Sequence, residues 1–393
     1  MSWRKQGGTG WSAHNMKGNL IRWPSMFLWP PMLASCGITY WIYELPSGYL
    51  AGLWILGFAA SLTLLMDALL GTRLPSVQQF RVQRYAGTRE SFLVMALAAG
   101  VAVFCLLDVA LFPIPLFSDP SSYATLSPLR SHVRHISNMC WILPPIALLC
   151  VRHRGLRTAM VLVGFVFPIV VIDRNRIFAG LFSFVVVLLL RRDPARQLPW
   201  KRIALLVMAG GAVFSVLGAL RSGSLATVAL PFSAFYRAMP QGVQWLLLYI
   251  SAGPYNFGAI LAKGYVNASF LINQLMPLGG SIATADTSIP LDAPNINVGT
   301  EFFPFLMAWG APGAVIALLA LYAALLWSVR RLNASLSIFH VLIFLRIAYA
   351  CLMSPFAPQA FTWTNFAFIG LCLGLHACTL LLPNRRVLPV ASA

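Results

Sequence analysis

Runs of apolar residues alternate with short polar loops along most of the chain. A helix needs about 20 apolar residues to cross a bilayer, and this length predicts ten helices. They cover approximately 23–43, 49–70, 91–117, 136–151, 158–172, 177–190, 203–220, 302–327, 334–356 and 364–383. The fifth and sixth runs are short, but the polar residues 173–176 between them would be costly in lipid and predict a hairpin tip. The pattern predicts an all-α polytopic integral membrane protein with a single membrane domain over 1–393.

One long segment, 221–300, separates the seventh predicted helix from the eighth. Its apolar stretch 243–261 is interrupted by polar and helix-breaking residues, which predicts re-entrant or interfacial helices lying against the bundle. Residues 276–297 are rich in Gly, Pro and Asp and are typical of a loop. Loops of this length in a compact protein usually have a function; a passive lid over the mouth of the bundle is the alternative.

Basic residues concentrate in every second loop, and this alternation predicts the orientation. The basic segments are 1–22, 71–90, 152–157, 191–202, 328–333 and the tail 384–393. Cytoplasmic loops carry an excess of Lys and Arg. Both termini are therefore predicted to be cytoplasmic, with no removable signal peptide, and the loop 221–300 is predicted to lie on the outer side.

Composition agrees with a membrane protein, since 59% of the residues are hydrophobic and 10% are charged. The formal net charge of +18 does not indicate nucleic-acid binding, because the basic residues are scattered between apolar runs and form no continuous stripe. Contact with anionic lipid explains most of this charge.

The sequence contains few groups of the kind that bind metals or nucleotides. Its seven cysteines lie in or at the ends of apolar runs, so neither a disulfide framework nor a metal cluster is implied. It has no Walker loop, HExxH, GxSxG or CxxC motif. No metal or cofactor is expected. His340 and His376 are interpreted as hydrogen-bonded core residues.

Several arginines stand in loops predicted to be outside, against the usual bias. Those near predicted helix ends are Arg130, Arg134, Arg174, Arg176, Arg221 and Arg237. If these ends converge, their guanidinium groups could grip the oxygens of one diphosphate. Capping of helix C-termini or contact with lipid headgroups is the alternative.

Arg346 differs from these because it lies near the middle of the ninth apolar run. A charge at that depth needs a partner or a polar cavity. One hypothesis pairs it with Asp108 or Asp67, and the other places it in a cavity that opens outward to an anionic group.

Three segments resemble bacterial O-antigen and oligosaccharide repeat unit polymerases. They are DRNRIFAG at 173–180, LYISAGPYNFG at 248–258 and NVGTEFFPFLMAWGAPG at 297–313. The resemblance covers about 170–325 and implies a metal-independent membrane glycosyltransferase of type C in the bacterial cytoplasmic membrane. Such an enzyme moves a growing chain from undecaprenyl diphosphate to the nonreducing-end hydroxyl of a new lipid-linked unit. Membrane lipids, a flippase and a chain-length regulator are the implied partners.

The resemblance and the residue chemistry together suggest roles for individual side chains. The catalytic candidates are Glu301, as general base, with Arg174 and Arg176; His132 and Asp292 are weaker bases. The diphosphate-binding candidates are Arg221, Arg346, Arg130, Arg134 and Arg237. The sugar-binding candidates are Tyr255, Asn256, Asn297 and Thr300. Alternatively, Glu301 is an acid that interacts with a helix dipole, and the aromatic residues form an interfacial belt.

Two other functions use related chemistry. A ligase that passes glycan to another acceptor shares the lipid diphosphate donor. A transporter or flippase of an anionic lipid-linked sugar would be expected to show an inverted repeat and several charges at the midplane, whereas Arg346 is the central charge that stands out here.

Overall fold

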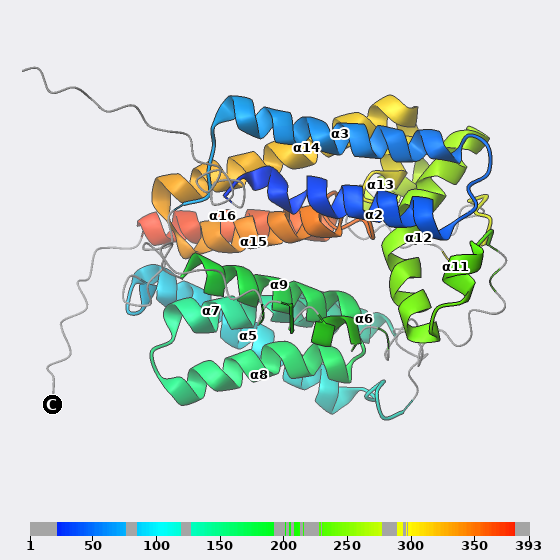
Figure 1. Cartoon of the computed structure of the whole chain (residues 1–393). Helices are drawn as coiled ribbons and strands as arrows, with labels where there is room; N and C mark the ends of the chain where they lie inside the picture. Colours follow the sequence, from blue (N-terminus) through cyan, green and yellow to red (C-terminus); the bar gives the residue numbers. More distant parts are fainter. Residues whose placement is uncertain are drawn as a thin grey trace, which may run out of the picture.

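Apolar helices that lie side by side form the body of the protein (Figure 1). The computed structural model describes residues 22–75, 85–118, 127–191, 230–276, 289–293 and 298–381, with the positions 201, 204–205, 208–212, 215, 228 and 296. Apart from an antiparallel bridge between Tyr43 and Phe232, the regular structure of these residues is helical. The predicted all-α class is confirmed for this part of the chain.

The helices follow the apolar runs of the sequence. In chain order they are η1 (Pro24–Phe27), α2 (Trp29–Ile42), α3 (Tyr49–Leu70), α5 (Arg89–Leu111), α6 (Pro128–Ser137), η4 (Asn138–Ile142), α7 (Leu143–Cys150), α8 (Arg154–Val170), α9 (Arg174–Leu190), α11 (Ala234–Arg237), α12 (Gln241–Lys263), α13 (Ser269–Leu275), α14 (Phe303–Ser335), α15 (Ile338–Met353) and α16 (Trp363–Leu381). Every predicted run except 203–220, most of which lies outside the described residues, coincides with one or more of them.

Six helical segments of the described chain are long and apolar enough to cross a membrane. They are α3, α5, the continuous segment Pro128–Cys150, α12, α14 and α16. The chain is therefore a helical multi-pass membrane protein. The number of ten crossings and the orientation of the termini stay predictions.

The loops form two sets according to the hydrogen bonds between them. These sets agree with the two sets of loops predicted from the basic residues. One end of the bundle joins segments around 22, 73–90, 152 and 333–338. The other end joins segments around 43, 116, 170–175, 231, 301 and 354. The predicted cytoplasmic loops and the predicted outer loops thus lie at opposite ends; the second is called the outer end below.

Helix α15 lies at the centre of the bundle, in contact with α5, α9, α14 and α16. Every residue from Ile338 to Cys351 is buried. A helix that is apolar all round is expected to be covered on all sides. The exceptions in its sequence are His340 and Arg346, and Arg346 requires the structure to accommodate a guanidinium group inside the core.

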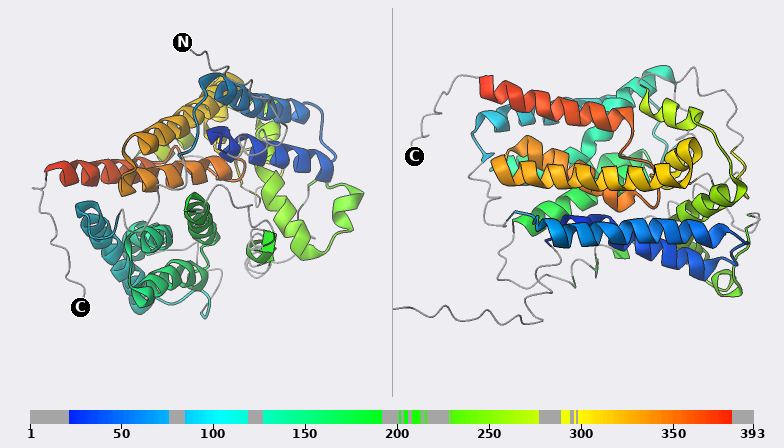
Figure 2. Two further views of the ribbon diagram at one scale, coloured as in Figure 1. Left: turned by 60° about the vertical axis from the view of Figure 1, so that its left-hand side comes forward. Right: turned by 90° about the horizontal axis from the view of Figure 1, so that it is seen from above.

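Helix α12 runs across the outer end of the bundle, at a steep angle to α3, α14 and α15 (Figure 1); Figure 2 shows the same arrangement from two other directions. It packs mainly against α3 and α2. The contact with α3 is close because glycines face each other: a Cβ atom on Gly52 would lie 2.7 Å from the Cα of Gly258. The absence of side chains at both positions lets the two backbones meet.

Gly258→Ala is expected to destabilise the protein, because the new Cβ would lie 2.6 Å from the carbonyl oxygen of Tyr49. That contact can be relieved only by separating α3 from α12. The expected result is a lower Tm of the purified protein in detergent. Gly100→Ala is the matched control, since a Cβ there meets no atom within 4 Å and alanine is the better helix former. Equal losses of Tm in both variants would contradict the close approach.

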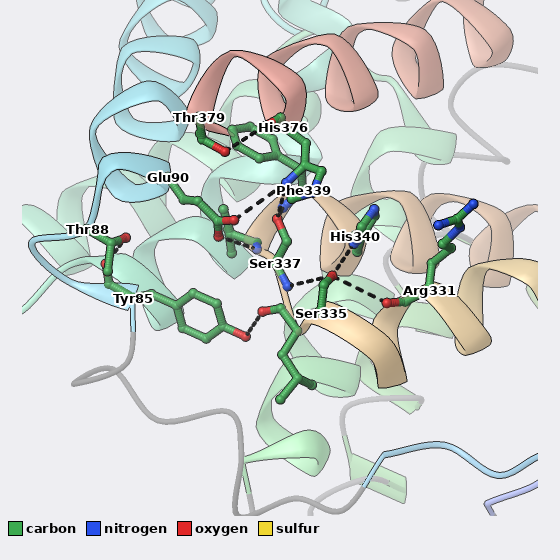
Figure 3. A network of polar contacts seen from close by, with 12 residues as sticks. Tyr85, Thr88, Glu90, Arg331, Ser335, Ser337, Phe339, His340, His376 and Thr379 are labelled. Atoms are coloured by element: carbon green, nitrogen blue, oxygen red, sulfur yellow. Dashed lines mark hydrogen bonds and ion pairs between the residues drawn. The ribbon is translucent and has the colours of Figure 1, made fainter. Parts of the chain in front are cut away.

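At the opposite end, a polar network ties α5 and α16 to the turn between α14 and α15 (Figure 3). The carboxylate of Glu90 accepts a hydrogen bond of 3.0 Å from the backbone N–H of Ile338 and lies 3.6 Å from Nδ1 of His376. His376 also hydrogen-bonds Ser337, at 3.1 Å, and His340 hydrogen-bonds Ser335. Both histidines are therefore hydrogen-bonded, as predicted; His340 is buried, whereas the side chain of His376 is 20% exposed.

Candidate functional site

The turn between α8 and α9 places two arginines at the outer end. Ile172 has a φ angle of +58°, which is unusual and unfavourable for a β-branched residue, yet its side chain is buried. Asp173 then caps α9 by accepting a hydrogen bond of 3.1 Å from the backbone N–H of Arg176. The first turn of α9 therefore carries Arg174 and Arg176 in fixed directions.

The two arginines point to different neighbours. Nη2 of Arg174 donates to the hydroxyl of Tyr249 at 2.6 Å, and its guanidinium carbon lies 4.6 Å from the centre of that ring. Arg174 thus joins α9 to α12 by a hydrogen bond and a cation–π contact. Arg176 instead lines a cavity between α9 and α16, and its Nε lies 3.8 Å from the Asp173 carboxylate.

The cavity, of about 230 Å³, brings together residues from five elements, of which only α6 and η4 are directly contiguous in the chain. Arg176 comes from α9 and Arg346 from α15, while α6, η4 and α16 supply the remaining wall. The polar and aromatic lining residues are His135, Asn138, Trp141, Arg176, Arg346, Trp363, Thr364 and Phe368. Two guanidinium groups therefore share one cavity with aromatic walls.

Arg346 is 6% exposed and is held by neutral groups. Its Nε donates to Oδ1 of Asn365 at 2.9 Å, and its Nη2 donates to the carbonyl oxygen of Gln359 at 3.2 Å. Within the described residues, Nη1 of Arg346 has no hydrogen-bond partner, and neither has Nε of Arg176. Buried donors without partners are costly, so an anion in the cavity would satisfy groups that the protein leaves open.

The hypothesis that Arg346 pairs with Asp67 or Asp108 is wrong, because other residues bind both carboxylates. Asp67 accepts hydrogen bonds from Ser25 N–H and the Tyr322 hydroxyl, each at 2.6 Å. Asp108 is occupied by other arginines. Each carboxylate is thus satisfied by residues closer to it, and Arg346 faces Asn365 instead.

Arg130 and Arg134 bind Asp108 and do not line the cavity. Nε of Arg130 lies 3.1 Å from Oδ1 of Asp108, and Nε of Arg134 contacts the other carboxylate oxygen. All three side chains are buried. Removing one partner of a buried ion pair usually costs several kcal/mol, so this cluster secures α6 to α5.

Glu301 is buried at the outer end, where it holds the loop between α15 and α16. Its carboxylate accepts backbone N–H groups of Gln359, Ala360 at 2.9 Å and Phe361 at 3.0 Å. Burial raises the pKa of Glu301 to about 7, although these donors and nearby Arg346 favour the ionised form. Three N–H donors on one carboxylate suit an anchor for the loop, and Glu301 is absent from the residues that line the cavity.

The predicted sugar-binding residues hold the outer segment 289–300 against α12. Nδ2 of Asn256 donates to the carbonyl oxygens of Ile296 and Val298, at 2.9 and 2.8 Å. The hydroxyl of Tyr255 donates to Asp292 at 2.7 Å. Thr300 is fully buried. These contacts indicate a structural role for Tyr255 and Asn256; the hydroxyl of Thr300 has no hydrogen-bond partner among the described residues, and Asn297 lies outside them.

Asp292 lies at the centre of this anchoring. Burial raises the pKa of its carboxyl group, but hydrogen bonds from Lys263, Tyr255 and Tyr49 outweigh it and lower the pKa below the usual value. The Nζ atom of Lys263 lies 2.6 Å from Oδ1 of Asp292. Because its oxygens are already bound, Asp292 is poorly placed to serve as a base.

Tyr255→Phe is expected to lower the free energy of unfolding by about 1.5–3 kcal/mol, the usual value for a hydrogen bond to a charged group. The ring is 1% exposed and packs 4.3 Å from the ring of Tyr43, centre to centre, so the change removes the hydroxyl and keeps the packing. A fall in the Tm would show the loss. Tyr40→Phe is the control, because that side chain is 62% exposed; an equal fall there would contradict the role of the Asp292 contact.

Two arginines of the predicted diphosphate site remain. Arg237 is exposed at the end of α11 and is not a lining residue. Arg221 lies outside the described residues.

Sequence reasoning missed His135, Asn138, Trp141 and Trp363, which line the cavity. The ring of His135 lies 5.5 Å from that of Trp363. A signal was present, because residues 135 and 138 are three apart and face the same side of a helix. This spacing indicates a cavity only if α16 is known to lie opposite these two residues, and the apolar pattern of the sequence does not reveal that.

The fold and site define a class: a helical multi-pass membrane protein with a cationic, aromatic-walled cavity at one end of its bundle. Comparisons with protein-family models, curated protein sequences and solved structures found no match for the chain.

Proposed function

We propose that the protein is a membrane glycosyltransferase that joins undecaprenyl diphosphate-linked oligosaccharide repeat units into a surface polysaccharide. The observation that carries this proposal is the cavity in which Arg176 and Arg346 meet. Both are cations, and each has an open N–H group within the described structure. A diphosphate provides the charge and the oxygens that such donors require.

In the proposed reaction, a hydroxyl of the incoming unit attacks the anomeric carbon of the growing chain. A new C–O bond forms, the bond to the diphosphate breaks, and its electron pair leaves on the diphosphate. Preorganised guanidinium groups stabilise the charge that develops there. The hydroxyl proton must pass to a base.

His135 replaces Glu301 as the favoured base in this proposal. It lines the cavity with both arginines, and histidine accepts a proton near neutral pH. Glu301 is engaged by three backbone N–H groups of another loop. A base must come within hydrogen-bond reach of the proton that it removes, which favours the residue in the cavity.

The proposed setting is the bacterial cytoplasmic membrane, with both termini in the cytoplasm and the cavity at the outer side. The substrate must then be flipped before use, which implies a flippase as a partner, and a chain-length regulator would act on the product.

Deletion of the gene, followed by electrophoresis of the surface polysaccharide, tests the function. A polymerase predicts loss of long chains with single repeat units still attached to the final acceptor. Complete loss of attached glycan would indicate a ligase or a flippase and would contradict the proposal. Unchanged long chains would reject all three functions.

A further inference from the structure

The arginine cavity continues along one face of α16 as an apolar channel. Thr364, Ala367 and Leu371 line it and lie on one stripe of the helix, since residues three and four apart share a face. Leu371 is eight residues from the start of α16, which corresponds to about 12 Å at 1.5 Å per residue. The cavity therefore extends from the outer end well into the depth of the bundle.

Two aromatic contacts frame this channel between α16 and the segment of α6 and η4. The rings of His135 and Trp363 lie 5.5 Å apart, and those of Trp141 and Phe368 lie 5.2 Å apart. Between them the wall of α16 is the small side chain of Ala367. The apolar lining at Ala367 and Leu371 suits an aliphatic chain better than a hydrated sugar.

The channel reaches the side surface of the bundle. Leu371 is 39% exposed, and Leu373 on another face of the same helix is 37% exposed. A Cβ atom built on Gly370 or Gly374 would meet no atom within 4 Å. Since α16 is one of the helices apolar enough to cross a membrane, this open side faces lipid.

One end of the channel is cationic and the rest is apolar. Arg346, 6% exposed, lines the cavity together with Arg176, and its Nη1 has no hydrogen-bond partner among the described residues. A ligand with an anionic head and a long hydrocarbon tail matches both parts. We propose that the polyprenyl tail of a lipid diphosphate lies along Thr364, Ala367 and Leu371 and reaches the cavity sideways, between α16 and η4. The identity of the lipid rests on the proposed function. The path of its tail rests on the residues that line the channel.

Photocrosslinking tests this path with the full-length protein in lipid nanodiscs. A photoreactive phenylalanine analogue replaces Leu371 in one variant and Leu373 in the matched control, and radiolabelled undecaprenyl diphosphate is the probe. The expected result is several-fold more labelled protein from position 371, reduced by excess inorganic diphosphate, which competes for the arginines. Equal labelling at both positions would overturn the path.

A second pair of variants checks the channel itself. Ala367→Trp fills the gap and is expected to abolish the preference for position 371, whereas Ala377→Trp, on an exposed position of the same helix, leaves it intact. Persistence of the preference in Ala367→Trp would overturn the proposal. Radiolabelled phosphatidylglycerol that labels position 371 as well as undecaprenyl diphosphate does would indicate an ordinary phospholipid site and would also overturn it.

Failure of the path and failure of the function give different results. Crosslinking requires no sugar and no transfer, so it can succeed although deletion of the gene leaves long polysaccharide chains. Conversely, a deletion strain restricted to single repeat units with equal labelling at 371 and 373 would support the polymerase and reject this tail path.

Discussion

Arg346→Ala and Arg176→Ala should each abolish or severely reduce chain growth while the protein remains in the membrane. Loss of one preorganised donor to a developing negative charge typically costs about 100-fold to 1,000-fold in rate. Long surface polysaccharide should therefore disappear from a deletion strain complemented with either variant, leaving single repeat units. Gel electrophoresis of the polysaccharide and an immunoblot of the membranes provide the two readouts.

Arg176→Ala is the cleaner of the two variants. Its guanidinium Nε makes no hydrogen bond among the described residues and lies 3.8 Å from the Asp173 carboxylate, whereas Arg346 also supports Asn365 and Gln359. Arg346→Lys keeps the charge but loses the fork that makes both contacts, so a partial loss of activity is expected. Arg237→Ala is the control, since this arginine is exposed and remote from the lining. Normal chain lengths with Arg176→Ala and Arg346→Ala would reject the diphosphate site.

Glu301→Ala is expected to destabilise the protein by about 3 kcal/mol or more, since each buried donor left unsatisfied costs about 1–3 kcal/mol. Three backbone N–H groups, of Gln359, Ala360 and Phe361, lose their acceptor. The loop that they belong to also provides the carbonyl oxygen for Arg346. Stability and activity should therefore fall together, as measured by the Tm and by polysaccharide length.

Glu301→Gln distinguishes an anchor from a general base. The amide keeps the size of the side chain but presents N–H groups to backbone donors, so an anchor predicts a reduced Tm. A base predicts loss of activity at an unchanged Tm. The second outcome would support Glu301 as the general base and contradict the assignment of that role to His135.

The stability contributed by Glu301 should also depend on pH. Its pKa is raised to about 7 in the folded protein, chiefly by burial, against about 4.3 in an unfolded chain. The folded state binds more protons between these values, so the contribution is fully present below about pH 4 and declines as the pH rises to 7. The Tm difference between wild type and Glu301→Gln should narrow over this interval; a difference that widened would contradict the raised pKa.

The helices could be predicted because burial in lipid constrains sequence strongly. The polar residues 173–176 predicted a turn, and the structure places it slightly earlier, between the end of α8 at Val170 and the start of α9 at Arg174. The two ends of the bundle also follow from the alternation of basic loops. These features depend on local composition and on the cost of charge in lipid, so they can be read without knowing how the helices pack.

The cavity could be predicted only in part, since it depends on how the helices are placed around α15. Arg130, Arg134 and Arg176 looked alike in sequence, yet the first two meet Asp108 and the third meets the cavity. Glu301 stood at a loop junction that suited a base, but its partners lie more than fifty residues away along the chain. Pairings of this kind arise from packing and leave no periodic signal.

The attachment of α16 has a mechanical consequence. Asn365 binds Arg346 near one end of the helix, and His376 binds Ser337 near the other, about 16 Å away at 1.5 Å per residue. A helix attached at both ends cannot rotate outward about one end. It can only bend between the two attachments. Gly370 and Gly374 lie in that middle stretch with empty space in front of them, and glycine weakens a helix, so we expect α16 to bend most easily between its two attachments.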